Sequence, residues 1–225
     1  MNKNNFQIAI DGPAGAGKST IAKIVAKELG FVYIDTGAMY RAMGLFFDRN
    51  GEWPGASGDV QRLAQSADIT LKYNDGVQEI YLNGENVSSE IRTEKAGLSA
   101  SAVSKFPEVR KILVAMQQKL AETTNVIMDG RDIGTVVLKD ADVKIFLTAN
   151  VRVRAERRMR QLEEQGIKES LEKIEEDIKK RDIQDSTREA SPLRMAEDAV
   201  LVDTSDCTLD ESVEKIIALA KEKMV

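Results

Sequence analysis

Glycines, a lysine and a serine stand near the start of the chain in the order that a phosphate-binding loop needs. The segment Gly12–Ser19 reads G-x-x-x-x-G-K-S and comes just after the short apolar run Ile8-Ala9-Ile10 and Asp11. Glycine tolerates positive φ, so the loop can turn several backbone N–H groups toward one anion. The helical pattern that follows would add its positive dipole end at the same place. The sequence therefore predicts a P-loop that binds two linked phosphates.

The polar residues of this loop have distinct expected tasks. Lys18 would reach the β- and γ-phosphates of a nucleotide, and the Ser19 hydroxyl would complete the coordination of a Mg²⁺ ion. The residues expected to bind the donor nucleotide are Gly12, Pro13, Ala14, Gly15, Ala16, Gly17, Lys18, Ser19 and Thr20. An ordinary glycine turn between strand and helix is the alternative interpretation, but order, spacing and flanking segments favour the P-loop.

A carboxylate ends a second apolar run, Asn125-Val126-Ile127-Met128-Asp129. A strand that ends in Asp has the form of a Walker B element, which holds Mg²⁺ or its water shell. Apolar strands ending in Asp are common, so this interpretation of Asp129 depends on its combination with the P-loop.

Arginines are the other residues that could act on phosphates. Arg41 follows the predicted strand 31–34, at the sheet edge where open α/β proteins bind ligands, so it is a candidate for a second phosphate. Between Val151 and Arg194 further arginines cluster at both ends of a helical hairpin pattern with a thin apolar stripe. A solvated charged hairpin is the alternative, but beside a P-loop we expect a lid whose arginines swing over the phosphates.

Composition narrows the classes of chemistry and of partner. The chain has no histidine, which removes Ser-His and Cys-His nucleophiles and most zinc sites. The net charge of −5 argues against a nucleic-acid or anionic-membrane surface. Cys207 is the only cysteine, so we expect it to pack rather than form an intrachain disulfide, in a cytoplasmic protein without a signal peptide.

These residues must be positioned by alternating strands and helices. Apolar runs predict strands near residues 6–11, 31–34, 126–129, 143–147 and 199–203, which would form a parallel sheet covered by helices. The β-rich segments 69–73 and 77–82, joined by Asn74-Asp75-Gly76, predict an antiparallel hairpin within an insert at about 58–92. The insert could serve the substrate site or be decoration; its composition favours neither.

Five motifs together give the chain its resemblance to a known family. They are the P-loop, Asp35-Thr36-Gly37-Ala38-Met39-Tyr40-Arg41, Phe106-Pro107-Glu108-Val109-Arg110, Gly130-Arg131-Asp132-Ile133-Gly134-Thr135 and Arg181-x-x-x-Asp185-x-x-Arg188. With them the chain resembles the bacterial cytidylate kinases nearly end to end, and the predicted hairpin module resembles the insert of the bacterial form. Thr36 departs from the pattern, since many relatives carry Ser there, but it keeps the hydroxyl.

The resemblance implies transfer of a phosphoryl group from ATP to CMP or dCMP with Mg²⁺. It implies that Ser101, Arg110 and Asp132 read the cytosine edge and that Asp185 holds the ribose hydroxyls. Arg41, Arg131 and Arg188 would clamp the monophosphate near Thr36, Arg181 would lie between substrate and lid, and Arg157 or Arg158 near the donor phosphates. The residues implied in catalysis are Lys18, Asp129, Arg131, Arg181 and Arg188.

The expected architecture is a single α/β kinase domain, a three-layer P-loop core with about five parallel strands. The core would comprise residues 1–36, 123–150 and 195–225, the monophosphate-binding region 37–122 with its antiparallel β insert, and the helical lid 151–194. The resemblance implies a monomer. Competing classes are a regulatory GTPase, a non-catalytic nucleotide-binding module and a kinase for a uridylate, adenylate or shikimate acceptor. No guanine-reading Asn or Thr followed by Lys-x-Asp is present, and the complete arginine set argues against a non-catalytic module.

Overall fold

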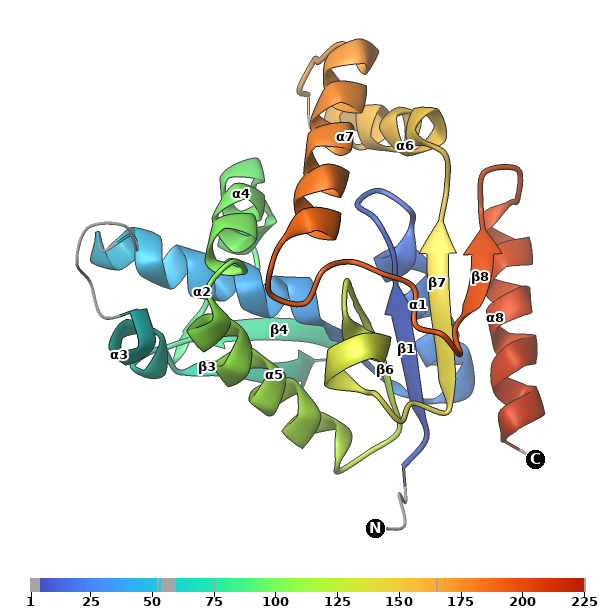
Figure 1. The fold of residues 1–225 in the computed structure, drawn as a ribbon, viewed down its shortest axis with the longest axis horizontal. Helices are drawn as coiled ribbons and strands as arrows, with labels where there is room; N and C mark the ends of the chain where they lie inside the picture. The colour runs from blue at the N-terminus through green and yellow to red at the C-terminus, as the bar shows by residue number, and fades with distance from the viewer. Residues whose placement is uncertain (1–4, 52, 54–59, 75, 165, 225) are drawn as a thin grey trace.

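A parallel sheet forms the centre of the protein (Figure 1). The computed structural model describes residues 5–51, 53, 60–74, 76–164 and 166–224. Five strands lie in the order β2-β6-β1-β7-β8, and every neighbouring pair is parallel. The strands are β1 Gln7–Asp11, β2 Val32–Asp35, β6 Val126–Gly130, β7 Val143–Thr148 and β8 Val200–Asp203. This confirms the predicted sheet.

The strand register brings the predicted motifs to one end of the sheet. Asp129 of β6 lies opposite Ile10 of β1 on one side and Asp35 of β2 on the other. The loops that follow β1, β2 and β6 therefore leave the sheet side by side, as expected of the ligand-binding edge of an open α/β sheet.

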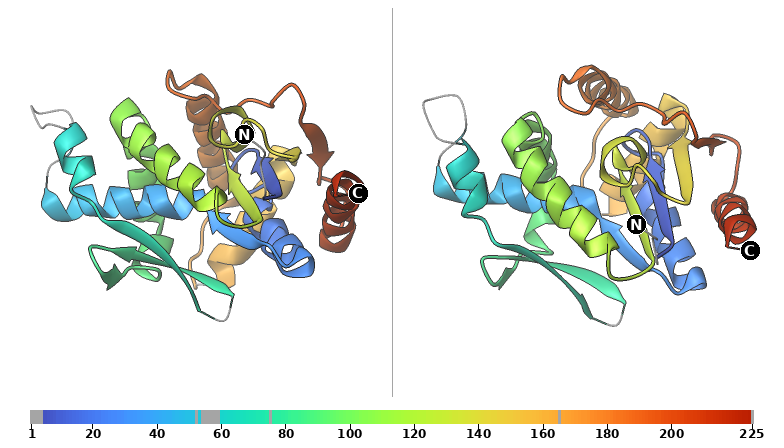
Figure 2. Two further views of the ribbon diagram at one scale, coloured as in Figure 1. Left: turned by 90° about the horizontal axis from the view of Figure 1, so that it is seen from below. Right: turned by 60° about the horizontal axis from the view of Figure 1, so that its bottom comes forward.

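Helices cover both faces because side chains alternate along each strand. Ile8 and Ile10 are fully buried in a cluster with α1 (Lys18–Leu29) and α8 (Leu209–Lys223). Ala9 points to the opposite face, where α5 (Pro107–Ala121) and the π-helical turn η2 (Ile133–Val137) pack. Figure 2 shows this layering from two further directions.

Helix ends follow the sequence signals. Gly30 ends α1 in the left-handed conformation, and Thr208 begins α8 with a complete capping box. The prediction that Cys207 packs inside the protein was wrong: Cys207 is exposed. It directly precedes the cap of α8, and a helix that starts at the surface leaves its preceding loop in solvent.

The motif that begins at Asp35 is a helix rather than a turn. Asp35 caps α2 (Thr36–Asn50) by accepting a hydrogen bond from the backbone N–H of Ala38. Gly44 allows α4 (Glu94–Val103) to approach α2 closely, since a Cβ at this position would lie 2.7 Å from the Cβ of Ser99. Two short elements, α3 (Val60–Gln65) and the 3₁₀ turn η1 (Glu90–Arg92), complete this region.

The predicted hairpin is present and has a third strand. β3 (Ile69–Asn74) pairs antiparallel with β4 (Val77–Leu82), which pairs with the short β5 (Glu85–Asn86). Residues 58, 59 and Asp75, which the prediction included, lie outside the described residues. Ile80 and Leu82 are buried against Met39 and Phe47 of α2, so the insert packs on the helix that carries Arg41.

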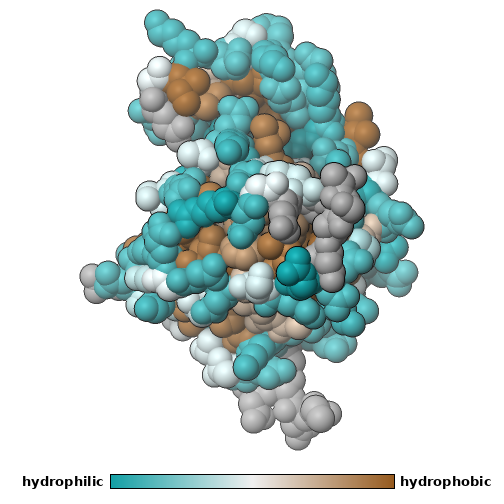
Figure 3. Space-filling model, turned by 90° about the vertical axis from the view of Figure 1, so that its left-hand side faces the viewer, coloured by the Kyte–Doolittle hydropathy of each residue, from teal (hydrophilic) through white to brown (hydrophobic). Residues whose placement is uncertain are grey.

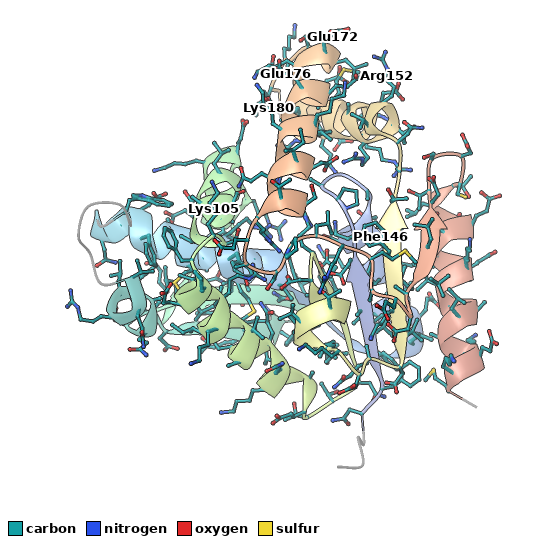
Figure 4. All side chains as sticks on the ribbon, in the orientation of Figure 1. Lys105, Phe146, Arg152, Glu172, Glu176 and Lys180 are labelled. Carbon is teal, nitrogen blue, oxygen red and sulfur yellow. The ribbon has the colours of Figure 1, made fainter. Side chains whose placement is uncertain are left out.

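The charged segment after β7 forms a helical hairpin of α6 (Val151–Glu164) and α7 (Leu171–Thr187) that stands above the core in Figure 1. Ala155, Leu162, Ile174 and Ile178 form its small buried cluster, in line with the thin apolar stripe of the sequence. Figure 3 shows a mainly hydrophilic surface over this hairpin, and Figure 4 shows charged side chains around its outer end. Within the described part of the chain, none of the helices combines the length and apolar character needed to cross a membrane.

Candidate active site

The loop between β1 and α1 has the strained geometry that its glycines predict. Gly17 has φ +92° and precedes the first residue of α1, so the loop turns directly into the helix N-terminus. Gly12 has φ +147°, and a Cβ there would lie 1.9 Å from the carbonyl oxygen of Leu147. In this structure Nζ of Lys18 donates to the carbonyl of Pro13 at 2.7 Å, which folds the lysine over the loop.

Ser19 and Asp129 meet although they are far apart in the sequence. The Ser19 hydroxyl donates to Oδ2 of Asp129 at 2.7 Å, and Tyr33 donates from Oη to Oδ1 of the same carboxylate at 2.8 Å. Burial and the nearby charge of Asp35 raise the pKa of Asp129. A hydroxyl beside a buried carboxylate suits Mg²⁺, which takes one or two protein oxygens together with substrate phosphates and waters.

Positive charge is concentrated around this pair. Burial and the adjacent charge of Arg131 lower the pKa of Lys18. Partial desolvation and the charge of Arg131 also lower the pKa of Arg181 to about 10, with Arg41 and Arg158 contributing, although Arg181 remains accessible to solvent. The mutual repulsion of these cations indicates a site whose natural content is an anion.

A second polar cluster lies beyond the ends of β6 and α7. Nη2 of Arg110 contacts Oδ2 of Asp132 in a buried ion pair, and Nη2 of Arg188 lies 3.7 Å from Oδ1 of Asp132. Three buried polar atoms here have no hydrogen-bond partner among the described residues: Arg110 Nε, Arg188 Nη2 and Tyr40 Oη. Arg41 Nε, on the residue paired with Asp35, is likewise buried without such a partner. Burial raises the pKa of Tyr40 to about 12, so its hydroxyl keeps its proton. Unpaired buried donors are costly, which favours a polar ligand as their partner.

Helix α7 of the α6–α7 hairpin contributes side chains to this cluster. Arg131 donates from Nε to Oδ2 of Asp185 at 2.8 Å, and the amide of Gln184 donates to the hydroxyl of Ser101. Burial acts to raise the pKa of Asp185, but the charges of Arg131 and Arg181 hold it below its ordinary value. The structure thus places Ser101, Asp132 and Asp185 on three elements that face one region.

Other predicted site residues are engaged by the protein itself. The Thr36 hydroxyl donates to the carbonyl oxygen of Asp129 at 2.7 Å, and Arg41 pairs with Asp35 at 2.7 Å. Arg157 lies beside the donor loop, where it donates to the carbonyl of Ala16 at 3.3 Å. It also donates to Oγ1 and the carbonyl oxygen of Thr204, at 3.0 and 2.8 Å. Arg158 lies near Arg181.

Sequence reasoning missed several residues of this region. Asp11 accepts hydrogen bonds from the backbone N–H groups of Ile133 and Gly134, both at 2.7 Å, and so holds the loop that carries Arg131 and Asp132. A carboxylate directly before the P-loop was the available signal. Tyr33 gave no signal because it lies within the apolar run 31–34. Tyr40 and Gln184 lie within the motifs 35–41 and 181–188, where other residues carried the interpretation.

Arg154 was also missed as an individual among the lid arginines. It binds both oxygens of Asp182, at 3.1 and 2.6 Å, and donates to the carbonyl oxygens of Ala14 at 3.0 Å and Ala149 at 2.8 Å. Its side chain is buried, so it joins the loop between β1 and α1 to both helices of the α6–α7 hairpin.

A parallel sheet with a P-loop, a carboxylate beside the loop serine and an arginine-lined second site defines a P-loop phosphotransferase. The sequence model of the cytidylate kinase family matches residues 8–222, and the chain belongs to that family. It is 49% identical over 219 residues to the cytidylate kinase of Caldicellulosiruptor bescii, covering 97% of this chain and 96% of the relative. It is also 49% identical over 223 residues to that of Lysinibacillus sphaericus, covering 99% and 100%.

Solved structures agree on the fold. A gluconokinase from Sinorhizobium meliloti superposes with a TM-score of 0.50 at 15% sequence identity, covering 98% of this chain and 94% of the other. At this identity the likeness concerns the arrangement of strands and helices.

Proposed function

We propose that the chain transfers the γ-phosphoryl group of ATP to CMP or dCMP, giving ADP and CDP or dCDP. The observation that carries the choice of acceptor is the buried Arg110–Asp132 pair, which lies beside the unpartnered hydroxyl of Tyr40. The membership of the cytidylate kinase family supports the same acceptor.

The base preference follows from donor and acceptor types. The Asp132 carboxylate would accept from the exocyclic amino group of cytosine, while Arg110 and Ser101 would donate to its O2 and N3. Uracil presents an oxygen where cytosine presents the amino group, so a carboxylate would face it unpaired. This arrangement favours CMP and dCMP over UMP.

The transfer needs positioning and charge rather than a covalent intermediate. A phosphate oxygen of CMP is already a nucleophile, so the protein has to align it with the γ-phosphorus of ATP. Arg41, Arg131 and Arg188 would hold the CMP phosphate, and Lys18 with Arg181 would neutralise the charge that is transferred. The Ser19–Asp129 pair would hold Mg²⁺, which when bound neutralises charge on the donor phosphates.

The α6–α7 hairpin has the small core and polar contacts expected of a lid that can move. Its own buried cluster is small, and it meets the rest of the protein through polar contacts such as Arg131–Asp185, Gln184–Ser101 and Arg154–Ala14. We place the lid at 151–194, the monophosphate-binding region at 37–122, and the core at 1–36, 123–150 and 195–225. Closure of the lid would exclude water from the transferring phosphoryl group.

The net charge of −5 supports small-molecule nucleotides rather than nucleic acid or a membrane surface as partners. The chain has a single cysteine, which suits a reducing compartment, so we place the enzyme in the cytoplasm. We also propose that it is a monomer.

The decisive experiment measures ADP release from ATP and Mg²⁺ with CMP, dCMP, UMP, AMP or no acceptor. Fast release with CMP and dCMP, slow release with UMP and background release alone are expected. Release that ignores the acceptor would replace this proposal with an ATPase or a nucleotide switch.

A further inference from the structure

The free edge of the central sheet is met by side chains of the insert. β2 is the edge strand, and the N–H of Val32 bonds inward to Asn125. Backbone groups alternate in direction along a strand, so those of Tyr33 and Asp35 face outward. These N–H and C=O groups have no neighbouring strand to pair with, so they need hydrogen-bond partners from another part of the protein.

Two insert residues supply those partners. Tyr73 donates from Oη to the carbonyl oxygen of Tyr33 at 3.0 Å, and Gln78 accepts through Oε1 from the N–H of Asp35 at 2.8 Å. Tyr73 and Gln78 lie directly opposite each other in the β3–β4 register. Directly opposed residues project to the same face of a sheet, so one cross-strand pair supports two successive outward groups of β2. In both views of Figure 2 the strands of the hairpin run along one side of the molecule beside α2.

The two supported residues of β2 act on the candidate active site. The Tyr33 side chain donates to Asp129, which also accepts from Ser19. Asp35 pairs with Arg41 at 2.7 Å and caps the helix that carries it. Each insert contact is therefore one residue removed from a side chain proposed to hold Mg²⁺ or the acceptor phosphate.

Apolar packing against α2 fixes the position of the insert. Ile69, Ile80 and Leu82 are buried in one cluster with Met39 and Phe47 of α2. The hairpin, α2 and β2 therefore support one another: apolar packing joins the first two, the Asp35 cap joins α2 to β2, and the Tyr73–Gln78 pair joins β2 to the hairpin.

We propose that Tyr73 and Gln78 are positioning residues for phosphoryl transfer, with Gln78 acting through Asp35 on Arg41 and Tyr73 acting through Tyr33 on Asp129. The inference rests on the proposed function, since it concerns the same site. It gives the antiparallel insert a task in catalysis rather than a decorative one.

The test uses substitutions that remove one hydrogen-bonding group and keep the side chain's size. Gln78→Met removes the acceptor oxygen, and Tyr73→Phe removes the hydroxyl. Tyr81→Phe is a matched control, because its hydroxyl bonds to Glu79 within the insert. Gln65→Met repeats the other substitution at an exposed position of α3. For each protein we would measure KM for CMP and for ATP, kcat, the Mg²⁺ concentration at half-maximal rate, Tm, and amide hydrogen exchange at Asp35.

The two variants have different expected signatures. Gln78→Met speeds exchange of the Asp35 amide and raises KM for CMP by about 3- to 10-fold, the effect of one hydrogen bond, with KM for ATP unchanged. Tyr73→Phe lowers kcat and raises the required Mg²⁺ by about 2- to 5-fold, again the effect of one hydrogen bond, with little change in KM for CMP. The control variants Tyr81→Phe and Gln65→Met are expected to have the KM, kcat and Mg²⁺ requirement of the wild-type protein.

Unchanged kinetic constants in both variants would overturn the inference. A fall in Tm with equal rises in KM for CMP and for ATP would also overturn it, because that result marks a purely structural role. A wild-type protein that does not phosphorylate CMP would overturn the proposed function and this inference with it. An active wild-type protein with unaffected variants would overturn the inference alone.

Discussion

Nε of Arg131 donates to Oδ2 of Asp185 at 2.8 Å, which ties the loop after β6 to lid helix α7. The loop follows β6 of the central sheet. The helix belongs to the α6–α7 hairpin, which has only a small buried cluster of its own. Arg131 also neighbours Lys18 and Arg181, whose pKa values it lowers. The contact therefore lies where the P-loop, the loop that carries Asp132 and the α6–α7 hairpin meet.

Replacing Arg131 or Arg188 with Ala should remove transition-state stabilisation without unfolding the protein. Each arginine is proposed to bind the phosphate that attacks, and single donors of this kind contribute roughly 3 kcal/mol, or about 10²-fold in kcat. Steady-state kinetics with CMP at saturating ATP measures the loss. Arg92→Ala, at an exposed position of η1, is the matched control and should match the wild-type enzyme. Near-normal turnover in Arg131→Ala or Arg188→Ala would refute the assignment of that arginine to the clamp.

Asp185→Ala should separate ribonucleotide from deoxyribonucleotide use. Burial acts to raise the pKa of Asp185, but the charges of Arg131 and Arg181 keep it low, so the carboxylate is ionised at neutral pH and can accept from a ribose hydroxyl. We expect kcat/KM for CMP to fall more than that for dCMP, which lacks the 2′-hydroxyl. Both substrates should also lose some turnover because Arg131 loses its partner. An equal loss would show that Asp185 does not contact the 2′-hydroxyl.

Asp132→Asn should weaken the discrimination between CMP and UMP. An amide can donate to the O4 of uracil where the carboxylate repels it, so the CMP-to-UMP ratio of kcat/KM should fall at least about 10-fold. The ratio is the informative quantity, because the variant also weakens the buried pair with Arg110. Thermal unfolding of the variant would check that the protein remains folded. A ratio equal to that of the wild-type enzyme would assign base recognition to other residues.

The sequence was most informative where local patterns determine structure. Apolar runs located the five strands, and the glycine spacing located the loop at Gly12–Ser19. The meeting of Ser19 with Asp129 followed from general sheet topology, because the carboxyl ends of parallel strands share an edge. These features depend on near neighbours or on rules that hold for every sheet of this type.

Contacts between distant elements could not be predicted in the same way. Nothing in the sequence separates Arg154, which is buried against Asp182 and the P-loop, from Arg152, which is exposed and pairs with Glu156 and Glu175 of the hairpin. Both lie on α6 within an alternation of arginine and valine, and only the packing of α7 and the loop distinguishes them. Tyr33 was hidden for a related reason: its ring fits a buried strand, and its hydroxyl finds Asp129 only once β6 lies beside β2.

Asp11 makes the stability of the protein depend on pH in a defined direction. Burial raises the pKa of Asp11 to about 6 from an ordinary value of 3.8, against the lowering effect of the Gly134 and Ile133 N–H groups. Between these values the folded protein binds more protons than the unfolded chain, so the free energy of unfolding falls as pH rises. Well above the folded-state value the contribution is constant. We therefore expect the stability of the wild-type protein relative to Asp11→Asn to fall by roughly 2–3 kcal/mol between pH 4 and pH 6.

Urea unfolding of the wild-type protein and Asp11→Asn across pH 4 to 7.5 measures this difference. Comparing the two proteins cancels the titration of every other group that the substitution leaves undisturbed. Asp11→Asn cannot accept both N–H groups, so it should also loosen the loop after β6 and raise KM for CMP more than KM for ATP at neutral pH. A stability difference that grows with pH over the same range would mean that these two hydrogen bonds outweigh burial and hold the pKa of Asp11 below its ordinary value.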